Sequence, residues 1–588
     1  MRRPLESVST ATLRHLLRAR LWIAERLGPA DQHYLLATAA VIGVAGALAA
    51  HLFRRATVLV HRILTGDSGS FVDSFAHLAW WQRILVPALG GALAGCALHF
   101  GARVRGGPKS SDYMEAIVVG DGRVSFRKGA VKCLSALFSG ASGASIGREG
   151  PLVQLAAMIA SLPERWFRLS LPKRRQLVAC GAAAGIASAY NAPIAGALFV
   201  AEIVLGSLAM ETFGPMVVAS VVATLVTRTF QGDGALYTTR AFVMGSAWEI
   251  APYAVLGIAC GLAAPLYLRF LRLSEAAFQR LPVHRIARMT LGGAIVGALA
   301  IARPEVCGNG YSVVGSILHS SWTAQALVAV LLLKVVATGA TFGSGAVGGV
   351  FTPTLLTGGA LGYLFGIGAA GLALFADLSP NASALVGMGG FLAAATGAPV
   401  MAILMVFELT LDYQIILPLM LACVLGYATS HAFETQFLYG ASIERKKSAR
   451  VEERLRSARA GDLMRPRPVR VGRNAAFREI AETFLQHRYN HVYVVNDDER
   501  FLGAVALHDI KAYLDHPELA QLVIAQEIQH EDFPWVTADT PLEQALARFQ
   551  AASSERLPVL DDDEHRRLIG TLSKNDLLMH LMDQVHAE

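Results

Sequence analysis

The sequence predicts an α-helical polytopic membrane protein with a soluble α/β tail, on the basis of its composition and the pattern of its apolar runs. Of the 588 residues, 53% are apolar and only 16% are charged, whereas soluble domains usually carry about 25% charge. The apolar residues gather in uncharged runs, and the runs 34–53 and 84–102 are each long enough to cross a bilayer. This composition excludes a disordered or fibrous chain, and it argues against a soluble enzyme throughout.

The charged residues are placed as in a membrane protein. The formal net charge is +7, and the basic residues gather at the ends of apolar runs and not on one face, which argues against a nucleic-acid partner. The N-terminal segment 1–32 and the linker 444–460 are both basic. Because basic segments stay on the cytoplasmic side, we expect both ends in the cytoplasm and a multi-pass protein in the lipid bilayer of the cell (inner) membrane.

The cysteines and the N-terminus give no sign of an exported, cross-linked protein. All six cysteines lie in apolar stretches and none forms a CxxC pair, so we expect small buried side chains instead of a disulfide framework or a zinc site, and no metal site. The N-terminus lacks the short apolar core and small-residue cleavage site of a signal peptide.

The membrane region, which we place at 33–443, mixes long apolar runs with short ones. The run 335–376 is twice the length of a single span, is rich in glycine and is interrupted by Pro353, whereas 133–147 and 151–162 are too short to cross alone. This mixture predicts broken helices that end inside the membrane, as in transport proteins whose binding site lies near the midplane. The 55 glycines indicate helices that approach closely.

A first candidate site is the motif GREGP at 147–151, which opens the apolar stretch 152–162. Glycine and proline at a helix start leave backbone N–H groups free, and the helix dipole adds positive potential, so such a start binds anions without a full cationic charge. Glu149 at its mouth could occupy the place of the anion and leave when it is protonated or displaced. Alternatively, Glu149 is an ordinary acid at a helix N-terminus. The candidate anion-binding residues are Gly147, Arg148 and Gly150.

Further helix starts of the same type follow along the chain. The motif GGVFTP at 348–353 offers free amides at Val350 and Phe351, and two such starts in one membrane domain favour a shared anion site, although a helix–helix loop is the alternative. The segment 190–196 breaks the run 176–201 in the same way. Tyr439, near the end of the membrane region, offers a phenolic donor or is an interfacial belt residue.

The tail contains an internal repeat, which predicts two α/β units at 461–516 and 522–588. Each unit reads as an amphipathic helix (475–485 and 542–550), two strands and a closing helix. Asp509 and Asp576 recur at the same spacing as Gly503 and Gly570.

Together, these motifs resemble those of the CLC family of chloride channels and chloride/proton antiporters, in its bacterial form. GREGP, NAPIAG (191–196), GGVFTP and FELT (407–410) stand in that family's order and spacing, and the resemblance covers about 33–443. The tail resembles a pair of CBS domains. The resemblance implies a CLC-type inverted repeat of tilted and broken helices, a cytoplasmic CBS pair, and a homodimer in which each subunit has its own pore.

The resemblance also implies roles for individual residues. Glu149 would be the gating glutamate, Val350 and Phe351 would supply backbone amides to a bound chloride, and Tyr439 would supply a hydroxyl from the cytoplasmic side. In the tail, Ser573 and Asp576 match the CBS pattern that grips a nucleotide ribose.

This chain departs from the family pattern in three places. Lys109 stands where the family has an anion-contacting serine, if the register follows the residues after it, and a lysine there would hold the anion more tightly; alternatively, Ser110 or Ser111 makes the contact. Ile203 stands where antiporters of the family usually carry a glutamate that passes protons. In the first CBS repeat Asp509 is present but Ala506 replaces the hydroxyl residue.

These observations predict chloride transport through a glutamate-gated pore that is channel-like or weakly proton-coupled. The alternative is a chloride/proton antiporter that uses another internal acid such as Glu202, although we expect Glu202 to accept hydrogen bonds within the packed helices. A fluoride exporter or a receptor with a membrane anchor is disfavoured, and so is an enzyme, because the sequence shows no catalytic set. We expect no cofactor apart from an adenine nucleotide on the CBS pair, with mere packing of the two repeats as the alternative.

Overall fold

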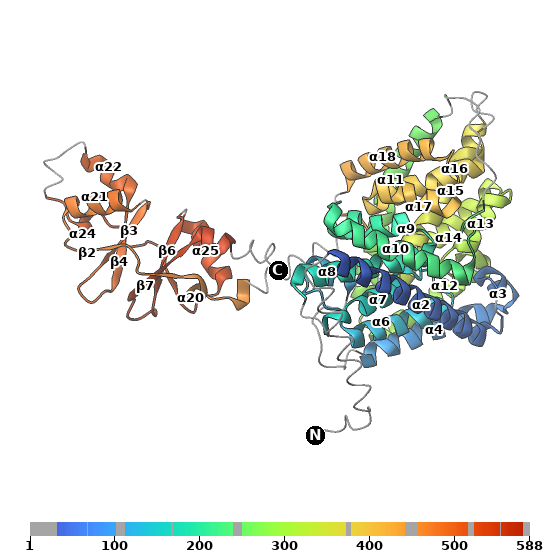
Figure 1. The fold of residues 1–588 in the computed structure, drawn as a ribbon, viewed down its shortest axis with the longest axis horizontal. Coiled ribbons are helices and arrows are strands. Elements are labelled where there is room, and N and C mark those ends of the chain that lie inside the picture. Colours follow the sequence, from blue (N-terminus) through green and yellow to red (C-terminus); the bar gives the residue numbers. More distant parts are fainter. Residues whose placement is uncertain are drawn as a thin grey trace, which may run out of the picture. The chain divides into compact units, whose positions relative to one another are not determined.

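The computed structural model describes residues 32–67, 69–101, 112–165, 169–238, 248, 250–371, 378–434, 436–440, 455–487, 489–514, 522–552 and 554–579. Its contacts divide the chain into two compact units, 1–443 and 444–588. The first unit is helical where it is described, and the second mixes strands and helices (Figure 1).

Eight helices in the described part of the first unit are long and apolar enough to cross a membrane. Their outward faces carry large apolar side chains, such as Leu52 at 70% exposure and Ile63 at 72%, which suits a lipid surrounding. The eight helices are α2 (Gln32–Thr65), α4 (Trp80–Gly101), α10 (Met210–Gln231), α11 (Ile250–Arg280), α12 (Arg285–Ala302), α14 (Ala324–Gly343), α15 (Phe351–Ala370) and α18 (Ile416–Phe433).

Shorter helices lie between the long ones, as the broken apolar runs predicted. Two pairs of them are single apolar runs interrupted by a left-handed residue, Asn191 at φ 56° and Gly397 at φ 73°, after which a proline begins the next helix. The other described helices are α3 (Phe71–His77), α5 (Tyr113–Val118), α6 (Phe126–Ala141), α7 (Glu149–Ala160), α8 (Leu171–Tyr190), α9 (Pro193–Leu198, continued by a π-helical turn Phe199–Leu205), α13 (Tyr311–His319), α16 (Pro380–Thr396) and α17 (Pro399–Thr410), and among them only α8 is as long as the shortest of the eight.

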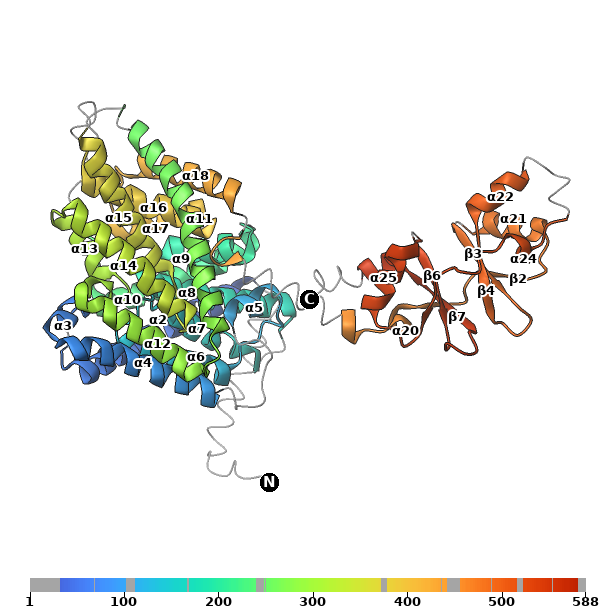
Figure 2. The same cartoon turned by 180° about the vertical axis from the view of Figure 1, so that it is seen from behind.

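Small residues allow the membrane helices to touch. Helices α15 and α16 lie side by side (Figures 1 and 2), and a Cβ atom added at Gly358 would stand 2.4 Å from the carbonyl oxygen of Gly387. The six cysteines are free, and all except the half-buried Cys96 are buried, as expected for small apolar side chains.

The tail confirms the predicted repeat. Each repeat of the tail contains an antiparallel strand pair, β3 with β4 in the first and β6 with β7 in the second. Each repeat also has a short parallel strand that the sequence did not reveal, β2 beside β3 and β5 beside β6 (Figure 2). The strands are β1 (Arg465–Pro466), β2 (Arg470–Gly472), β3 (His491–Val495), β4 (Phe501–Ala506), β5 (Val536–Thr537), β6 (Arg556–Leu560) and β7 (Leu568–Ser573). The helices are α20 (Ala460–Leu463), α21 (Phe477–Gln486), α22 (Leu507–Leu514), α24 (Ala525–Ile528) and α25 (Leu542–Ala552).

Candidate anion-binding site

The two predicted anion-binding helix starts meet in the structure. Helix α7 begins at Glu149 and α15 at Phe351, and the loops before them are joined by two backbone hydrogen bonds. The N–H of Gly147 donates to the carbonyl of Gly349 at 2.6 Å, and the N–H of Gly349 donates back at 3.1 Å. A Cβ atom at either position would meet the Glu149 carboxylate, so a side chain there would push the carboxylate out of its place. The N–H of Gly147, which we predicted to face an anion, is therefore already occupied.

The carboxylate of Glu149 lies on the N-terminus of α15. Its side chain is buried, and its two oxygens accept hydrogen bonds from the N–H of Thr352 at 3.2 Å and from the hydroxyl of Thr352 at 3.3 Å. The hydroxyl of Tyr190 lies 3.2 Å from that of Thr352. The sequence analysis named Val350 and Phe351 as donors and missed Thr352, although a hydroxyl in the first turn of an apolar helix was a visible signal.

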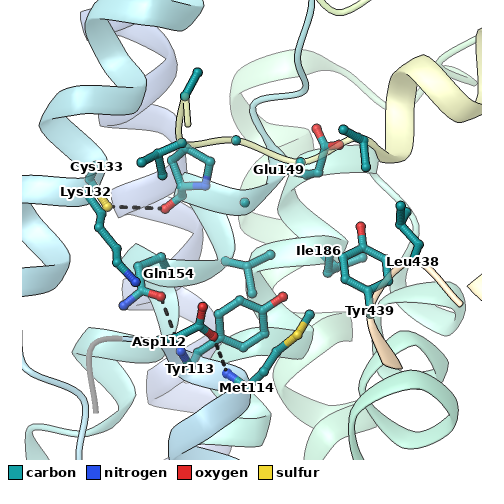
Figure 3. Close-up of a pocket in the computed structure, with 18 of the residues that line it drawn as sticks. Asp112, Tyr113, Met114, Lys132, Cys133, Glu149, Gln154, Ile186, Leu438 and Tyr439 are labelled. Atoms are coloured by element: carbon teal, nitrogen blue, oxygen red, sulfur yellow. Dashed lines mark hydrogen bonds between the residues drawn. The ribbon is translucent and has the colours of Figure 1, made fainter. Parts of the chain in front are cut away.

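A cavity of about 350 Å³, here called the tyrosine cavity, extends from Glu149 to Tyr439. Figure 3 shows Glu149 at the top of this cavity, with the rings of Tyr439 and Tyr113 below it. Gly150 and Val350 also line it, so three of the residues predicted to bind the anion share one space with the predicted gating glutamate. The ring of Tyr439 is held edge-on against Phe199, with 5.5 Å between centroids.

Other polar groups of the tyrosine cavity were not predicted. Asp112 accepts a hydrogen bond from the N–H of Met114 at 2.9 Å and so caps α5, while the Gln154 side chain accepts one from the N–H of Tyr113 at 3.3 Å. Lys132 also lines the cavity. Lys109, Ser110 and Ser111, the candidates for a further anion contact, lie outside the described residues.

A second cavity, here called the arginine cavity, has a volume of about 210 Å³ and is lined in part by Arg54, Arg148, Asn309 and Tyr311. Glu149 lines it too, and Glu149 is the one described residue that lines both this cavity and the tyrosine cavity. The structure therefore places Arg148 away from Tyr439, with its guanidinium 5.7 Å from the ring centre of Phe71. The carboxylate of Glu149 separates the two spaces.

Glu202 holds the start of another helix. The N–H groups of Val400 and Met401, in the first turn of α17, donate to its two oxygens at 3.2 and 2.7 Å. These bonds match the expectation that Glu202 accepts hydrogen bonds within the packed helices. Ile203, the next residue, lies half-buried in the π-helical turn.

Glu408 makes the reciprocal contact. The N–H groups of Ile194 and Ala195, at the start of α9, donate to its two oxygens at 2.9 and 2.8 Å. Each glutamate thus ends one helix and caps the start of the other, and we call this pair the reciprocal clamp. The clamp relates α8–α9 to α16–α17 as two copies of one unit, as expected for an inverted repeat.

A buried lysine was also missed. The side chain of Lys334 on α14 is fully buried, and its Nζ donates to the carbonyls of Val306 and Gly308 at 2.8 and 2.7 Å. The lysine therefore holds the loop that carries Asn309. Its signal in the sequence was a single charge between two long uncharged runs.

The two aspartates of the tail that are candidates for nucleotide binding already have hydrogen-bond partners within the tail. Asp576 accepts two hydrogen bonds from the guanidinium of Arg465, both at 2.7 Å, while Asp509 accepts one from the N–H of Ala506 at 3.1 Å and lies 2.8 Å from His530 Nε2. Ser573 is buried at the end of β7. A ribose bound at Asp576 would therefore compete with Arg465.

Comparison with known proteins agrees with this architecture. A family model described as "Voltage gated chloride channel" matches residues 90–431, and a CBS domain model matches 460–516 and 525–583. A ClcB-like chloride channel protein of Ralstonia nicotianae is 51% identical over 417 residues, which are 70% of this chain and 97% of that protein. The voltage-gated ClC-type chloride channel ClcB of Citrobacter koseri is 38% identical over 411 residues, 69% of this chain and 97% of its own.

Solved structures share the fold. A slow cyanobacterial Cl⁻/H⁺ antiporter superimposes with a TM-score of 0.62 at 24% identity, over 70% of this chain and 97% of its own. A eukaryotic CLC transporter superimposes with a TM-score of 0.58 at 18% identity, over 92% of this chain and 97% of its own. At these identities the likeness extends to the fold alone.

The fold and the site thus define a multi-pass helical membrane protein of the transport class, with broken helices that meet at a buried carboxylate. The chain belongs to the CLC family of voltage-gated chloride channels and carries a C-terminal pair of CBS domains. Members of this family are channels and transporters and not enzymes.

Proposed function

We propose that this protein carries chloride and other small anions across the membrane through a pore that Glu149 opens and closes. One observation supports this proposal above all: the Glu149 carboxylate occupies the N-terminus of α15 and is the boundary between the tyrosine cavity and the arginine cavity. The names of the relatives, which are chloride channels, point the same way.

The chemistry of the gate follows from competition for the same donors. The N–H and hydroxyl of Thr352 bind the ionised carboxylate, and a helix N-terminus of this kind also binds small anions such as chloride. Two negative charges at one helix N-terminus repel each other, so an arriving anion displaces the carboxylate. Protonation has the same effect, because a neutral carboxyl group loses its attraction to the helix dipole. Val350, Phe351 and Tyr439 would then hold the anion on its way through the tyrosine cavity.

We propose that chloride transport is at most weakly coupled to proton movement. Ile203 cannot titrate, and both oxygens of Glu202 are used in holding α17. The alternative is a chloride/proton antiporter in which Glu202, or another acid such as Glu408 or Glu115, passes protons to Glu149. The solved antiporter structures share this fold, but fold alone does not decide between a channel and an antiporter.

Chloride efflux from proteoliposomes, recorded together with proton movement, tests the proposal. We expect chloride to run down its gradient without driving protons uphill, and the Glu149→Ala variant to conduct chloride with no pH dependence. Glu149→Gln, which has the shape of the protonated form, should behave like Glu149→Ala. Sustained uphill proton movement that Glu149→Ala stops would establish the antiporter instead, and unchanged pH dependence in that variant would exclude Glu149 as the gate.

We propose in addition that Lys109 binds the conducted anion and strengthens its binding. A charge-assisted bond between the ammonium group and the anion would contribute about 1–3 kcal/mol to binding. Lys109→Ser should therefore weaken equilibrium chloride binding in a calorimetric titration, whereas equal affinity would assign the contact to Ser110 or Ser111.

The remaining proposals concern assembly and regulation. The protein would be a homodimer in the cell (inner) membrane with both termini in the cytoplasm, and its CBS pair would regulate transport without conducting ions. An adenine nucleotide on that pair would depend on Asp576 more than on Asp509, because Ser573 has no hydroxyl counterpart in the first repeat. Titration of ATP onto Asp576→Ala and Asp509→Ala tests this order, and equal losses would contradict it.

A further inference from the structure

Tyr439 lies on an irregular segment that follows α18. The helix ends at Phe433, and the segment after it, described at 434 and 436–440, is not helical before Gly440. Leu438 and Tyr439, near the end of this segment, line the tyrosine cavity (Figure 3). Because an irregular segment lacks the regular backbone hydrogen bonds of a helix, its place depends on the particular groups that bind it. The place of the Tyr439 ring therefore depends on those contacts.

Two arginines of α11 bind the start of this segment. The guanidinium of Arg269 donates to the carbonyl of Phe433 at 3.0 Å, and that of Arg272 donates to the carbonyl of Gln436 at 3.3 Å. Arg272 also forms an ion pair with the carboxylate of Glu434, and the Nε of Arg269 is 3.8 Å from the same oxygen. The second oxygen of Glu434 accepts the N–H of Gln436 at 3.1 Å. Glu434 is buried, at 8% exposure, and we call these three charged side chains the Glu434 anchor.

Helices α11 and α18 already pack closely without the Glu434 anchor. They lie side by side (Figures 1 and 2), and small residues bring their backbones into contact. A Cβ atom added at Gly257 would stand 2.7 Å from the Cα of Ala422, and one added at Gly261 would stand 2.7 Å from the carbonyl oxygen of Gly426. The bonds of the anchor instead lie at the last residue of α18 or beyond it. Their effect therefore falls on the segment that carries Tyr439.

The anchored turn is close enough to Tyr439 to move its ring. Only two residues separate Gln436 from Tyr439, and between them the N–H of Leu438 donates to the carbonyl of Ala395 at 3.0 Å. A displacement at Gln436 is therefore transmitted to the ring or breaks this bond. A hydrogen bond from a hydroxyl weakens steeply when its distance and angle become worse. Contact between Tyr439 and a bound anion is thus sensitive to the anchor.

We propose that Glu434, held by Arg269 and Arg272, positions Tyr439 in the tyrosine cavity and thereby sets the affinity of that cavity for chloride. None of the three charged residues lines the cavity, so they act through the segment and are not anion ligands. The effect on affinity rests on the proposed binding of the anion by Tyr439. The positioning of the ring does not rest on that function.

Glu434→Gln is the decisive variant, because it keeps the shape of the side chain and an acceptor for the N–H of Gln436 but loses the ion pair. In proteoliposomes we expect the half-saturating chloride concentration to rise about tenfold, which corresponds to the loss of one hydrogen bond to a charged group. Removal of a negative charge by itself would lower that concentration, so the sign of the change separates a displaced ring from an altered field. In the Tyr439→Phe background, Glu434→Gln should have no further effect.

Glu164→Gln is the matched control. Glu164 forms an ion pair with Arg123 and lies 3.6 Å from Arg174, so it too is a carboxylate between two arginines. Its side chain is 15% exposed, against 9% for that of Glu434, and none of these three control residues lines the tyrosine cavity. We expect Glu164→Gln to lower the unfolding temperature about as much as Glu434→Gln does and to leave the half-saturating chloride concentration unchanged.

The position of the ring can be measured without any transport. Fluorotyrosine placed at position 439 of the full-length protein gives a fluorine NMR signal that reports the surroundings of this one ring. Glu434→Gln should shift or broaden the signal, and so should Arg272→Gln. Glu164→Gln should leave it in place.

The two measurements separate the inference from the proposed function. A fluorine signal that stays in place in Glu434→Gln would overturn the inference and leave the proposed function intact. An equal rise of the half-saturating concentration in Glu434→Gln and Glu164→Gln would overturn it as well, because a general loss of packing would then explain both. If the signal moves but Tyr439→Phe leaves the half-saturating concentration unchanged, the positioning stands, while the proposed role of Tyr439 in holding the anion fails, and the effect on affinity fails with it.

Discussion

Three glutamates among the described residues of the membrane domain accept hydrogen bonds from the first turn of another helix, but in two different settings. Glu202 and Glu408 form the reciprocal clamp, in which each accepts two backbone N–H groups of the opposite helix. Glu149 accepts hydrogen bonds from the N–H and the hydroxyl of Thr352, its carboxylate also lies against the backbone N–H of Phe351, and it has a cavity on either side. Neither clamp glutamate lines any of these cavities.

The comparison teaches that the same interaction can be structural or functional. An anion on a helix N-terminus is favourable in all three places, so the interaction itself does not define a gate. What differs is whether the carboxylate has somewhere to go and whether another anion can reach its donors. The clamp glutamates line none of the described cavities, whereas Glu149 lies between two cavities that are large enough for ions.

The largest effect should come from removing a clamp glutamate. Glu408→Ala would leave the N–H groups of the buried Ala195 and of the more exposed Ile194 without their acceptor. At about 1–3 kcal/mol for each group that water cannot reach, we expect the free energy of unfolding to fall by about 1–6 kcal/mol. Glu202→Ala should have a similar effect at α17. Glu149→Ala is the comparison variant: Glu149 itself lines a cavity on either side, so water or an anion can take the place of its carboxylate beside Thr352, and the change should cost much less. Thermal unfolding of the purified protein in detergent measures all three, and equal losses would break the comparison.

A smaller effect is expected at Thr352. Thr352→Ala keeps the N–H that binds Glu149 and removes the hydroxyl, which contributes about 1.5–3 kcal/mol when it bonds a charged group. The carboxylate would occupy its place for less of the time, so chloride flux at neutral pH should rise by about tenfold. Thr352→Ser retains the hydroxyl and should restore the wild-type rate. A flux that is the same in all three proteins would show that the hydroxyl does not hold the gate.

The smallest effect should come from Tyr190. The hydroxyl of Tyr190 forms a hydrogen bond with that of Thr352, so it acts on Glu149 only through Thr352. Tyr190→Phe removes one neutral hydrogen bond, about 0.5–1.5 kcal/mol, of which only a part reaches the carboxylate, and flux should rise no more than about threefold. In the Thr352→Ala background the same change should have no effect on flux, and a full effect there would place Tyr190 outside this chain of hydrogen bonds.

Much of this site was predictable because its signals are local. A glycine- and proline-containing helix start predicts free N–H groups wherever it occurs, and both 147–151 and 348–353 begin helices as expected. The break at Asn191 and the repeat in the tail were also visible in short stretches. In each case neighbouring residues determine the backbone.

The contacts between distant segments were not predictable in this way. The glycine pair that joins the two loops, and the choice of Thr352 as donor, depend on how two halves of the chain pack. The clamp left a trace, since Pro193 to Glu202 and Pro399 to Glu408 have the same spacing, which a search for repeats in the membrane region would find. The arginine cavity has no comparable signal in the sequence, because Arg54, Arg148 and Asn309 come from three separate segments.

The contact between Glu149 and Thr352 also has a consequence for the synthesis of the protein. Thr352 follows Glu149 by 203 positions in the chain, and the ribosome adds residues at only about 5–20 per second. Glu149 therefore waits ten seconds or more, on that order, before its partner exists, and a carboxylate in lipid without a partner is costly. The first half must enter the membrane with this charge protonated, hydrated or sheltered by other proteins. Synthesis of the second half supplies Thr352 and so gives the carboxylate its hydrogen-bond partner.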